Sequence, residues 1–173
     1  METLLTMTAT EETNVILFDK SSRFSNDSFT PFFSDGLEFK SITHFMEYHK
    51  ARMFKRAGVM RQIMDSKTVQ QSEALVNDLV YNELAQWYNE AEGVVLKGLL
   101  CKFKQHPALA NALAKTKGSE LVLCSSEEGY WGNGLDRSEA RKISKRRWPG
   151  HNKLGSLLMQ IRAMMTPNDD DFA

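Results

Sequence analysis

The residues best placed to do chemistry together lie in the stretch Ser41–Ala51, which reads SITHFMEYHKA. Thr43, Glu47 and Lys50 recur at the spacing that places side chains on one face of a helix. A hydroxyl, a carboxylate and an ammonium on one face can line a pocket. The alternative is a solvated helix edge, the commoner place for such residues. A second, mostly apolar face of the same helix carries Ile42, Phe45, Met46, His49 and, just beyond the stretch, Met53.

A second group of candidate residues is basic and occupies the segment 137–153. Its members concentrate positive charge in a short stretch: Arg137, Arg141, Lys142, Lys145, Arg146, Arg147 and Lys153. Such a cluster is typical of a phosphate clamp or a nucleic-acid contact, with Arg146 and Arg147 as the phosphate ligands. Trp148 would then stack on a base or pack the segment down. The alternative is a solvated segment balanced by Asp136 and Glu139.

The composition limits what the whole chain can do. Its 173 residues suit one domain with a real core, and 42% hydrophobic and 25% charged residues are ordinary for a globular protein. Lys and Arg number 22, as do Asp and Glu, so any attraction to nucleic acid or membrane must be local. The two cysteines lack CxxC spacing, and the N-terminus lacks the basic start of a signal peptide. We therefore expect a cytoplasmic protein with no membrane partner.

The elements that must position these residues can be read from local patterns. Strands are predicted at 14–19, 37–40 and 120–125, the second paired across an Asp35-Gly36 turn. Ser41 is a plausible N-cap for the helix that carries Glu47. Further helical stretches are predicted at 58–66, 66–80, 82–106, 107–118 and 152–165. The sum is a helix-rich α+β domain over 14–165, between a flexible segment 1–13 and an acidic flexible tail 166–173.

An ordered set of short motifs runs from Val15 to Arg162. It comprises RFSN, G-x-x-F-x-S-x-x-H-F, K-A, a tryptophan, KF-x-x-H-P, YWG-x-G and N-K-LG-x-LLM-x-x-R. In this order and spacing the set resembles the NADAR family, also called YbiA-like. The resemblance implies a helix-rich α+β fold and an N-glycosidase, which cleaves the bond between ribose C1 and a nitrogen. Family substrates include early phosphorylated riboflavin intermediates and ADP-ribose attached to guanine of nucleic acid, and no metal or cofactor is implied.

The resemblance also assigns roles to individual residues. Phe24, Ser25 and Asn26 match a loop that borders the family's pocket, and Trp87 matches a tryptophan beside the ligand. The other ligand-binding positions carried over are Lys50, Lys102, Trp131, Gly132 and Asn152. Positions matched without a ligand role are Phe103, Gly134, Leu154, Gly155, Leu158 and Arg162.

One departure from the family pattern bears on catalysis. The family's catalytic glutamate corresponds to Thr43, which cannot carry the negative charge that stabilises a ribosyl cation. Glu47, one turn further along the same face, is the candidate replacement, and Glu128 is a candidate acid. Alternatively, both are solvated carboxylates, with Glu47 paired to Lys50. The substitution Thr43→Glu is then expected to restore the missing carboxylate.

Three hypotheses follow from this departure. The chain is an active glycosidase that uses Glu47 or Glu128, a ligand-binding or sequestering module that has lost hydrolysis, or a protein-interaction domain. The expected partner is a small nucleotide or ribosylated ligand such as ADP-ribose, which would connect the protein to NAD metabolism. Nucleic acid is a further possible partner through the segment 137–153.

Overall fold

The structure is a computed structural model that describes residues 14–78 and 81–165. Two small sheets lie in it. Strand β1 (Asn14–Phe18) pairs in parallel with β4 (Ser119–Leu123), in a register that sets Asn14 opposite Ser119. Strands β2 (Phe32–Ser34) and β3 (Leu37–Phe39) form an antiparallel hairpin. Its turn residues Asp35 and Gly36 both have positive φ, 51° and 80°, which is the backbone of a tight hairpin turn. The predicted hairpin is confirmed.

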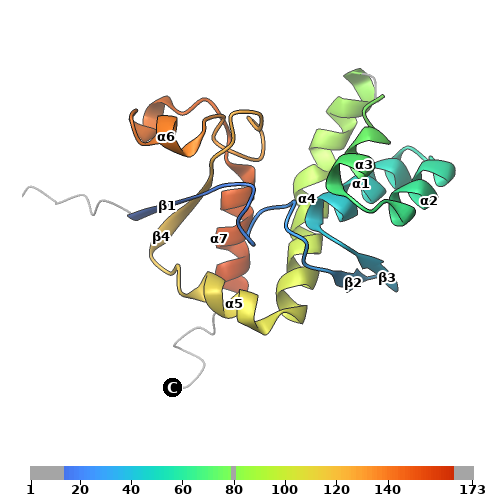
Figure 1. Cartoon of the computed structure of the whole chain (residues 1–173), viewed down its shortest axis with the longest axis horizontal. Helices are drawn as coiled ribbons and strands as arrows, with labels where there is room; N and C mark the ends of the chain where they lie inside the picture. Colours follow the sequence, from blue (N-terminus) through green and yellow to red (C-terminus); the bar gives the residue numbers. More distant parts are fainter. Residues whose placement is uncertain (1–13, 79–80, 166–173) are drawn as a thin grey trace, which may run out of the picture.

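Two helices form the centre of the molecule. Helix α4 (Tyr81–Gln105) and helix α7 (Lys153–Met165) stand side by side in Figure 1 and pack against each other. On one side lie β1, β4 and the short helix α6 (Arg137–Ala140). On the other side lie α1 (Ile42–Met53), α2 (Ala57–Asp65), α3 (Val69–Ala74) and the β2–β3 hairpin. Helix α5 (Pro107–Ala114) follows α4 and packs against α7. Among the described residues, none of the helices is both long and apolar enough to cross a membrane.

The core is built where α1, α4, α7 and β4 meet. Most of the predicted apolar stripe of α4 is buried there: Val95, Leu99 and Phe103 are each 0% exposed, while Leu96 and Leu100 are half-buried. Helix α1 can approach α4 closely because Gly98 has no side chain, and a Cβ at that position would lie 2.8 Å from the Phe45 ring. This close approach leaves little of the first turns of α1 exposed to solvent.

The α+β class and most predicted elements are confirmed, with differences at two places. The predicted helical stretch 66–80 shortens to α3, which begins after the N-cap Thr68. The basic segment, for which we predicted no element, contains α6 and the 3₁₀ turn η1 (Lys145–Arg147). Asp136 and Glu139 form a capping box that starts α6, a local side-chain arrangement that nucleates a very short helix. The segments 1–13 and 166–173, which we predicted to be flexible, lie outside the described residues.

Candidate functional site

The polar face of α1 is buried rather than solvated. Ser41 caps the helix by accepting a hydrogen bond from the His44 amide, as predicted. Within the first two turns, Thr43 is 2% exposed and Glu47 is 3% exposed. The interpretation of this face as a solvated helix edge is therefore wrong. Tertiary packing buries this face, because the loop after β1, helix α3 and the loop after β4 all approach it.

Glu47 is a buried carboxylate held by one lysine. The Lys50 ammonium donates to Glu47 Oε2 at 2.8 Å and lies 5.3 Å from the centre of the Trp87 ring. Burial raises the pKa of Glu47, and the positive charge of Lys50 opposes that rise. The carboxylates of Glu73 and Glu128 raise the Glu47 pKa further. The predicted pairing of Glu47 with Lys50 is present, but in a desolvated place where charges interact strongly.

Thr43 brings a second carboxylate to the same face. Its hydroxyl donates to Asp27 Oδ1 at 2.5 Å, and its backbone amide donates to the Asn26 carbonyl at 2.9 Å. A carboxylate therefore does lie beside position 43, but it comes from the loop after β1. Asp27 is not among the site residues predicted from the sequence, although it directly follows the FSN motif predicted to border the pocket.

We use the name carboxylate cluster for Asp27, Glu47, Glu73 and Glu128. These four come from the loop after β1, from α1, from α3 and from the loop after β4. Burial raises the pKa of Glu128, and the charges of Asp27 and Glu73 add to the rise. The pKa of Glu73 is raised by burial and then by Asp27. Three acids of the cluster, Glu47, Glu73 and Glu128, therefore have pKa values above the usual range, which is typical of sites that transfer protons.

The FSN loop contacts helices α4 and α1. The Phe24 ring stacks on Phe103 of α4 with centroids 6.3 Å apart, and Ser25 and Asn26 are buried. The side-chain carbonyl of Asn26 is buried without a hydrogen-bond partner among the described residues. Next to this loop, Lys102 is 0% exposed and its ammonium donates to the Arg23 carbonyl at 3.1 Å. Burial lowers the pKa of Lys102 to about 8.

The two candidate tryptophans belong to one core. Trp87 is 3% exposed and Trp131 is 7% exposed, and both lie in the cluster that surrounds α4 and α7. Each therefore packs as a core residue in this structure, and stacking on a base stays a prediction for both.

Gly132 and Asn152 connect the loop after β4 to the start of α7. The Asn152 amide side chain bonds the edge of β4, accepting from the Leu123 amide at 3.0 Å and donating to the Leu121 carbonyl at 2.9 Å. The Gly132 carbonyl accepts from the Asn152 amide at 2.9 Å. A Cβ on Gly132 would lie 2.9 Å from the carbonyl oxygens of Glu128 and Leu123. These contacts are structural, and ligand binding by Gly132 and Asn152 stays a prediction.

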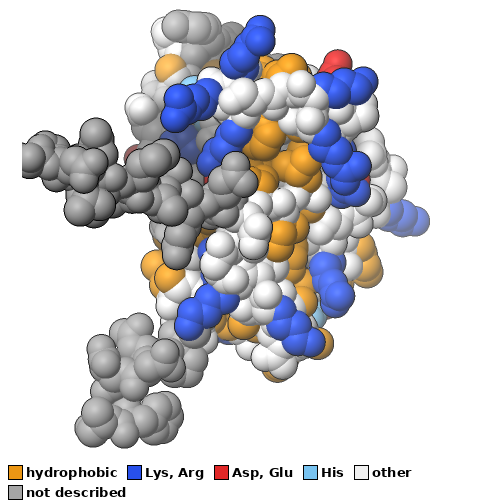
Figure 2. Space-filling view, turned by 90° about the vertical axis from the view of Figure 1, so that its left-hand side faces the viewer, with side chains coloured by type: hydrophobic (Ala, Val, Ile, Leu, Met, Phe, Trp, Pro, Cys, Tyr) orange, Lys and Arg blue, Asp and Glu red, His pale blue; other side chains and the backbone are white. Residues whose placement is uncertain are grey.

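The basic segment lies on the side of the molecule that carries β1, away from α1. Arg146 and Arg147 are exposed on η1, while Arg141, Lys145 and Trp148 line a pocket of about 350 Å³ with Val15 and Leu17. The Trp148 indole is fixed because its N–H donates to the Ala140 carbonyl at 3.2 Å. Figure 2 shows this side, where Lys and Arg side chains surround an apolar centre.

The carboxylate cluster raises the question of a metal site. Within residues 14–78 and 81–165, no group of three or more His, Cys, Asp or Glu side chains is arranged to hold a metal ion.

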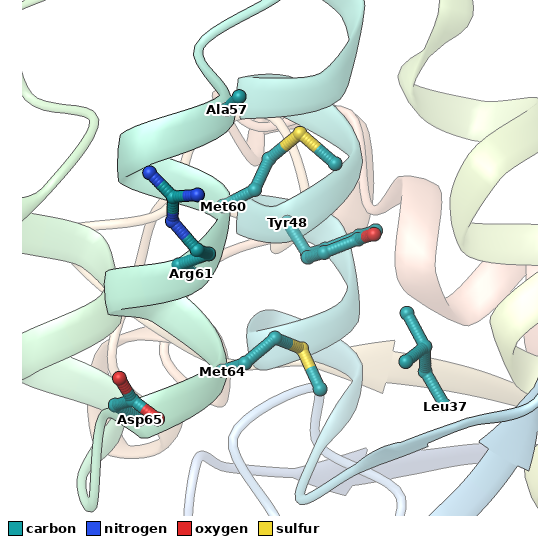
Figure 3. Close-up of a pocket in the computed structure, with 7 residues that line it drawn as sticks. All are labelled: Leu37, Tyr48, Ala57, Met60, Arg61, Met64 and Asp65. Carbon is teal, nitrogen blue, oxygen red and sulfur yellow. The ribbon is translucent and has the colours of Figure 1, made fainter.

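A separate pocket of about 470 Å³ lies between α1, α2 and β3, where the Met60 and Met64 side chains point toward Tyr48 and Leu37 (Figure 3). None of the carboxylate-cluster residues lines that pocket.

Comparison with known proteins places the chain in a family. The NADAR domain profile matches residues 8–166, nearly the whole chain, so the chain belongs to the NADAR family. N-glycosidase R617 of Acanthamoeba polyphaga mimivirus is 30% identical over 125 residues, which are 72% of this chain and 74% of that protein. N-glycosidase YbiA of Escherichia coli is 26% identical over 147 residues, covering 85% of this chain and 83% of YbiA.

A solved structure shares the fold. The NMR structure of E. coli YbiA superposes with a TM-score of 0.67, at 24% identity, over 91% of this chain and 90% of YbiA. A longer plant relative, the chloroplastic riboflavin biosynthesis protein PYRR of Zea mays, matches 88% of this chain with only 25% of its own length. The fold therefore occurs both as a small protein and as one part of a larger one.

Proposed function

We propose that this protein is an N-glycosidase that hydrolyses the bond between ribose C1 and the nitrogen of a base or amine. Its substrate is an N-linked ribose phosphate, such as ADP-ribose or a related N-glycoside. Membership of a family that includes N-glycosidases supports the reaction class. The observation that carries the proposal is Glu47, a buried carboxylate within a cluster of acids on the α1 face where the family resemblance puts its catalytic glutamate.

The reaction needs a negative charge near C1 and a proton for the leaving nitrogen. In this proposal Glu47 faces the developing ribosyl cation and orients the attacking water. The Lys50 ammonium lies 2.8 Å from Glu47 Oε2 and favours the charged form of Glu47. Glu128 protonates the leaving nitrogen. Its raised pKa, which has burial as the main cause, keeps the proton available at higher pH than an exposed glutamate would.

The alternative is a binding module that holds the same ligands without hydrolysing them, and Glu47→Gln separates the two. The substitution keeps the shape of the side chain and an acceptor for Lys50 but removes the charge. Release of free base from a panel of N-ribosides would be followed by chromatography. We expect the wild type to release base and Glu47→Gln to lose about a hundredfold or more in rate. A wild type that binds these ligands without releasing base would instead support the binding module.

The basic face supports a second proposal, contact with the phosphates of a nucleic acid. Arg137, Lys145 and Lys153 are neutralised by ion pairs with Asp19, Glu120 and Glu92. The remaining cations make no ion pair within the described part of the chain: Arg141, Lys142, Arg146 and Arg147. Unpaired cations around an indole are the combination that single-stranded nucleic acids bind. The third hypothesis, a protein-interaction domain, does not explain why the α1 face buries so many ionisable groups.

A further inference from the structure

A small pocket lies next to the carboxylate cluster, at the start of α1. Its volume is about 190 Å³, and it is lined by the loop after β1, the cap and first turn of α1, and the segment that leads into α3. The side chains that matter here are Asp27, Phe29, Lys40, His44, Lys67 and Thr68. No sequence pattern predicts this pocket, because these residues come from three separate segments.

Two lysines give this pocket a positive lining. The Lys40 ammonium donates to the Ser66 carbonyl, and Lys67 is exposed. Neither ammonium makes an ion pair with a carboxylate among residues 14–78 and 81–165. His44 adds no charge of its own, because burial lowers its pKa. Its Nδ1 accepts from the Lys40 amide at 3.2 Å, and its Nε2 lies 2.7 Å from the Ile63 carbonyl oxygen.

The other lining groups suit a sugar. Asp27 accepts the Thr43 hydroxyl with Oδ1, so its second oxygen can accept from a sugar hydroxyl. The Phe29 ring is 74% exposed, which is unusual for so apolar a side chain and leaves an aromatic face for a planar group. A volume of about 190 Å³ is below the usual range for pockets that hold drug-sized ligands, and it suits a sugar phosphate.

Asp27 connects this pocket to the proposed catalytic face. It lines the pocket and, through its contact with Thr43 at 2.5 Å, stands on the same face of α1 as Glu47. A sugar seated in the pocket would therefore have its ring beside the carboxylate cluster.

We propose that this pocket binds the phosphorylated ribose of the substrate, with Lys40 and Lys67 on the phosphate and Asp27 on a ribose hydroxyl. The proposal rests on the proposed function for the identity of the substrate. Phe29 contacts the sugar or the attached base at the rim. The inference assigns the phosphate of the substrate to the α1–α3 side of the molecule, away from the basic segment 137–153.

The test is a titration with ribose 5-phosphate, ribose and inorganic phosphate, followed by NMR or calorimetry. We expect ribose 5-phosphate to bind the wild type more tightly than either fragment. Lys67→Gln should weaken that binding about tenfold, because it removes a charge-assisted hydrogen bond. Phe29→Ala should weaken it several-fold. The matched controls are the exposed residues Lys104 and Phe33, and neither Lys104→Gln nor Phe33→Ala should change the affinity.

The outcomes separate this inference from the proposed function. Unchanged ribose 5-phosphate affinity in both Lys67→Gln and Phe29→Ala overturns the inference, and so does equal affinity for inorganic phosphate, which would indicate a general anion site. If the protein hydrolyses an N-riboside and Lys67→Gln leaves the KM unchanged, the inference is overturned while the glycosidase function stands. Conversely, Lys67-dependent binding of ribose 5-phosphate by a protein that cleaves no N-riboside supports the pocket and removes the proposed function.

Discussion

At the scale of single residues, Thr43 brings a carboxylate from another segment onto the α1 face. The resemblance seen in the sequence predicts that Thr43 occupies the position of the family's catalytic glutamate. In the folded chain the Thr43 hydroxyl donates to Asp27 Oδ1 at 2.5 Å, so a carboxyl group lies at that point of the α1 face. Assigning roles position by position along the sequence does not reveal this contact, because Asp27 and Thr43 lie on different segments.

This contact changes the expected effect of Thr43→Glu. The new carboxylate would be nearly fully buried beside Asp27, and like charges in a desolvated place repel strongly. We expect a loss of roughly 2–4 kcal/mol in the free energy of unfolding and no gain in hydrolysis. Thr43→Ser keeps the hydroxyl and should stay within about 1 kcal/mol of the wild type. Urea denaturation and the base-release assay measure both effects; a faster Thr43→Glu enzyme of normal stability would contradict this account.

Lys102 allows a second prediction, about stability and pH. Its pKa is lowered by burial from 10.5 to about 8, so the folded state releases its proton before the unfolded state does. Below pH 8 the ammonium is charged in both states, and its burial costs up to about 3 kcal/mol. Between pH 8 and 10.5 the Lys102 amine is neutral in the folded state and charged in the unfolded state. The free energy of unfolding of the wild type therefore rises with pH in this range.

Lys102→Met removes this cost, although the Arg23 carbonyl loses its donor. We expect the variant to be about 1–2 kcal/mol more stable than the wild type at neutral pH. The advantage should shrink as pH rises above 8. Unfolding free energies at neutral and alkaline pH test this, with the exposed Lys104→Met as control. An advantage that is constant across this range would show that the buried ammonium is not its source.

At the scale of elements, glycines decide how closely the helices approach their neighbours. A Cβ on Gly155, at the start of α7, would overlap with the Leu121 carbonyl oxygen of β4 and with the Asn152 side chain. Gly93 lies in the middle of α4, and a Cβ there would have no neighbour within 4 Å. The same substitution should therefore have opposite effects at the two positions.

We expect Gly155→Ala to lower the free energy of unfolding by about 3 kcal/mol, because α7 must move away from β4. Gly93→Ala should raise it by up to about 1 kcal/mol, since alanine favours a helix interior. Thermal and urea denaturation measure both changes. Equal effects of the two substitutions would show that the contact between α7 and β4 does not depend on Gly155.

At the scale of the whole molecule, charge is distributed unevenly although the chain is neutral overall. Acids gather at the α1 face, and the cations of the basic segment that make no ion pair with another described residue lie on the side of β1 (Figure 2). A polyanion would therefore meet the molecule on the basic side. Whether it does so is tested by the double substitution Arg146→Ala and Arg147→Ala.

We expect the double variant to bind a single-stranded oligonucleotide more weakly and with a salt slope lower by about 1 to 2, one for each lost phosphate contact. Fluorescence anisotropy at about 50 and 200 mM salt measures the slope. Lys115→Ala with Lys117→Ala, a pair of exposed lysines after α5, is the control. An unchanged affinity and slope in the arginine variant would assign the segment to a solvated surface.

The amino-acid sequence by itself determined the features that depend on neighbouring residues. The strand at 14–18, the Asp35-Gly36 turn, the Ser41 cap and the long apolar stripe of α4 follow from local propensity and periodicity, and the ordered motifs identified the family. Tertiary structure alone decided that Thr43 and Glu47 are buried, that Asp27 and Glu73 join Glu128, and that Lys102 reaches Arg23 across 79 positions of the chain. Burial and charge proximity depend on which distant segments pack together, and no local pattern encodes that.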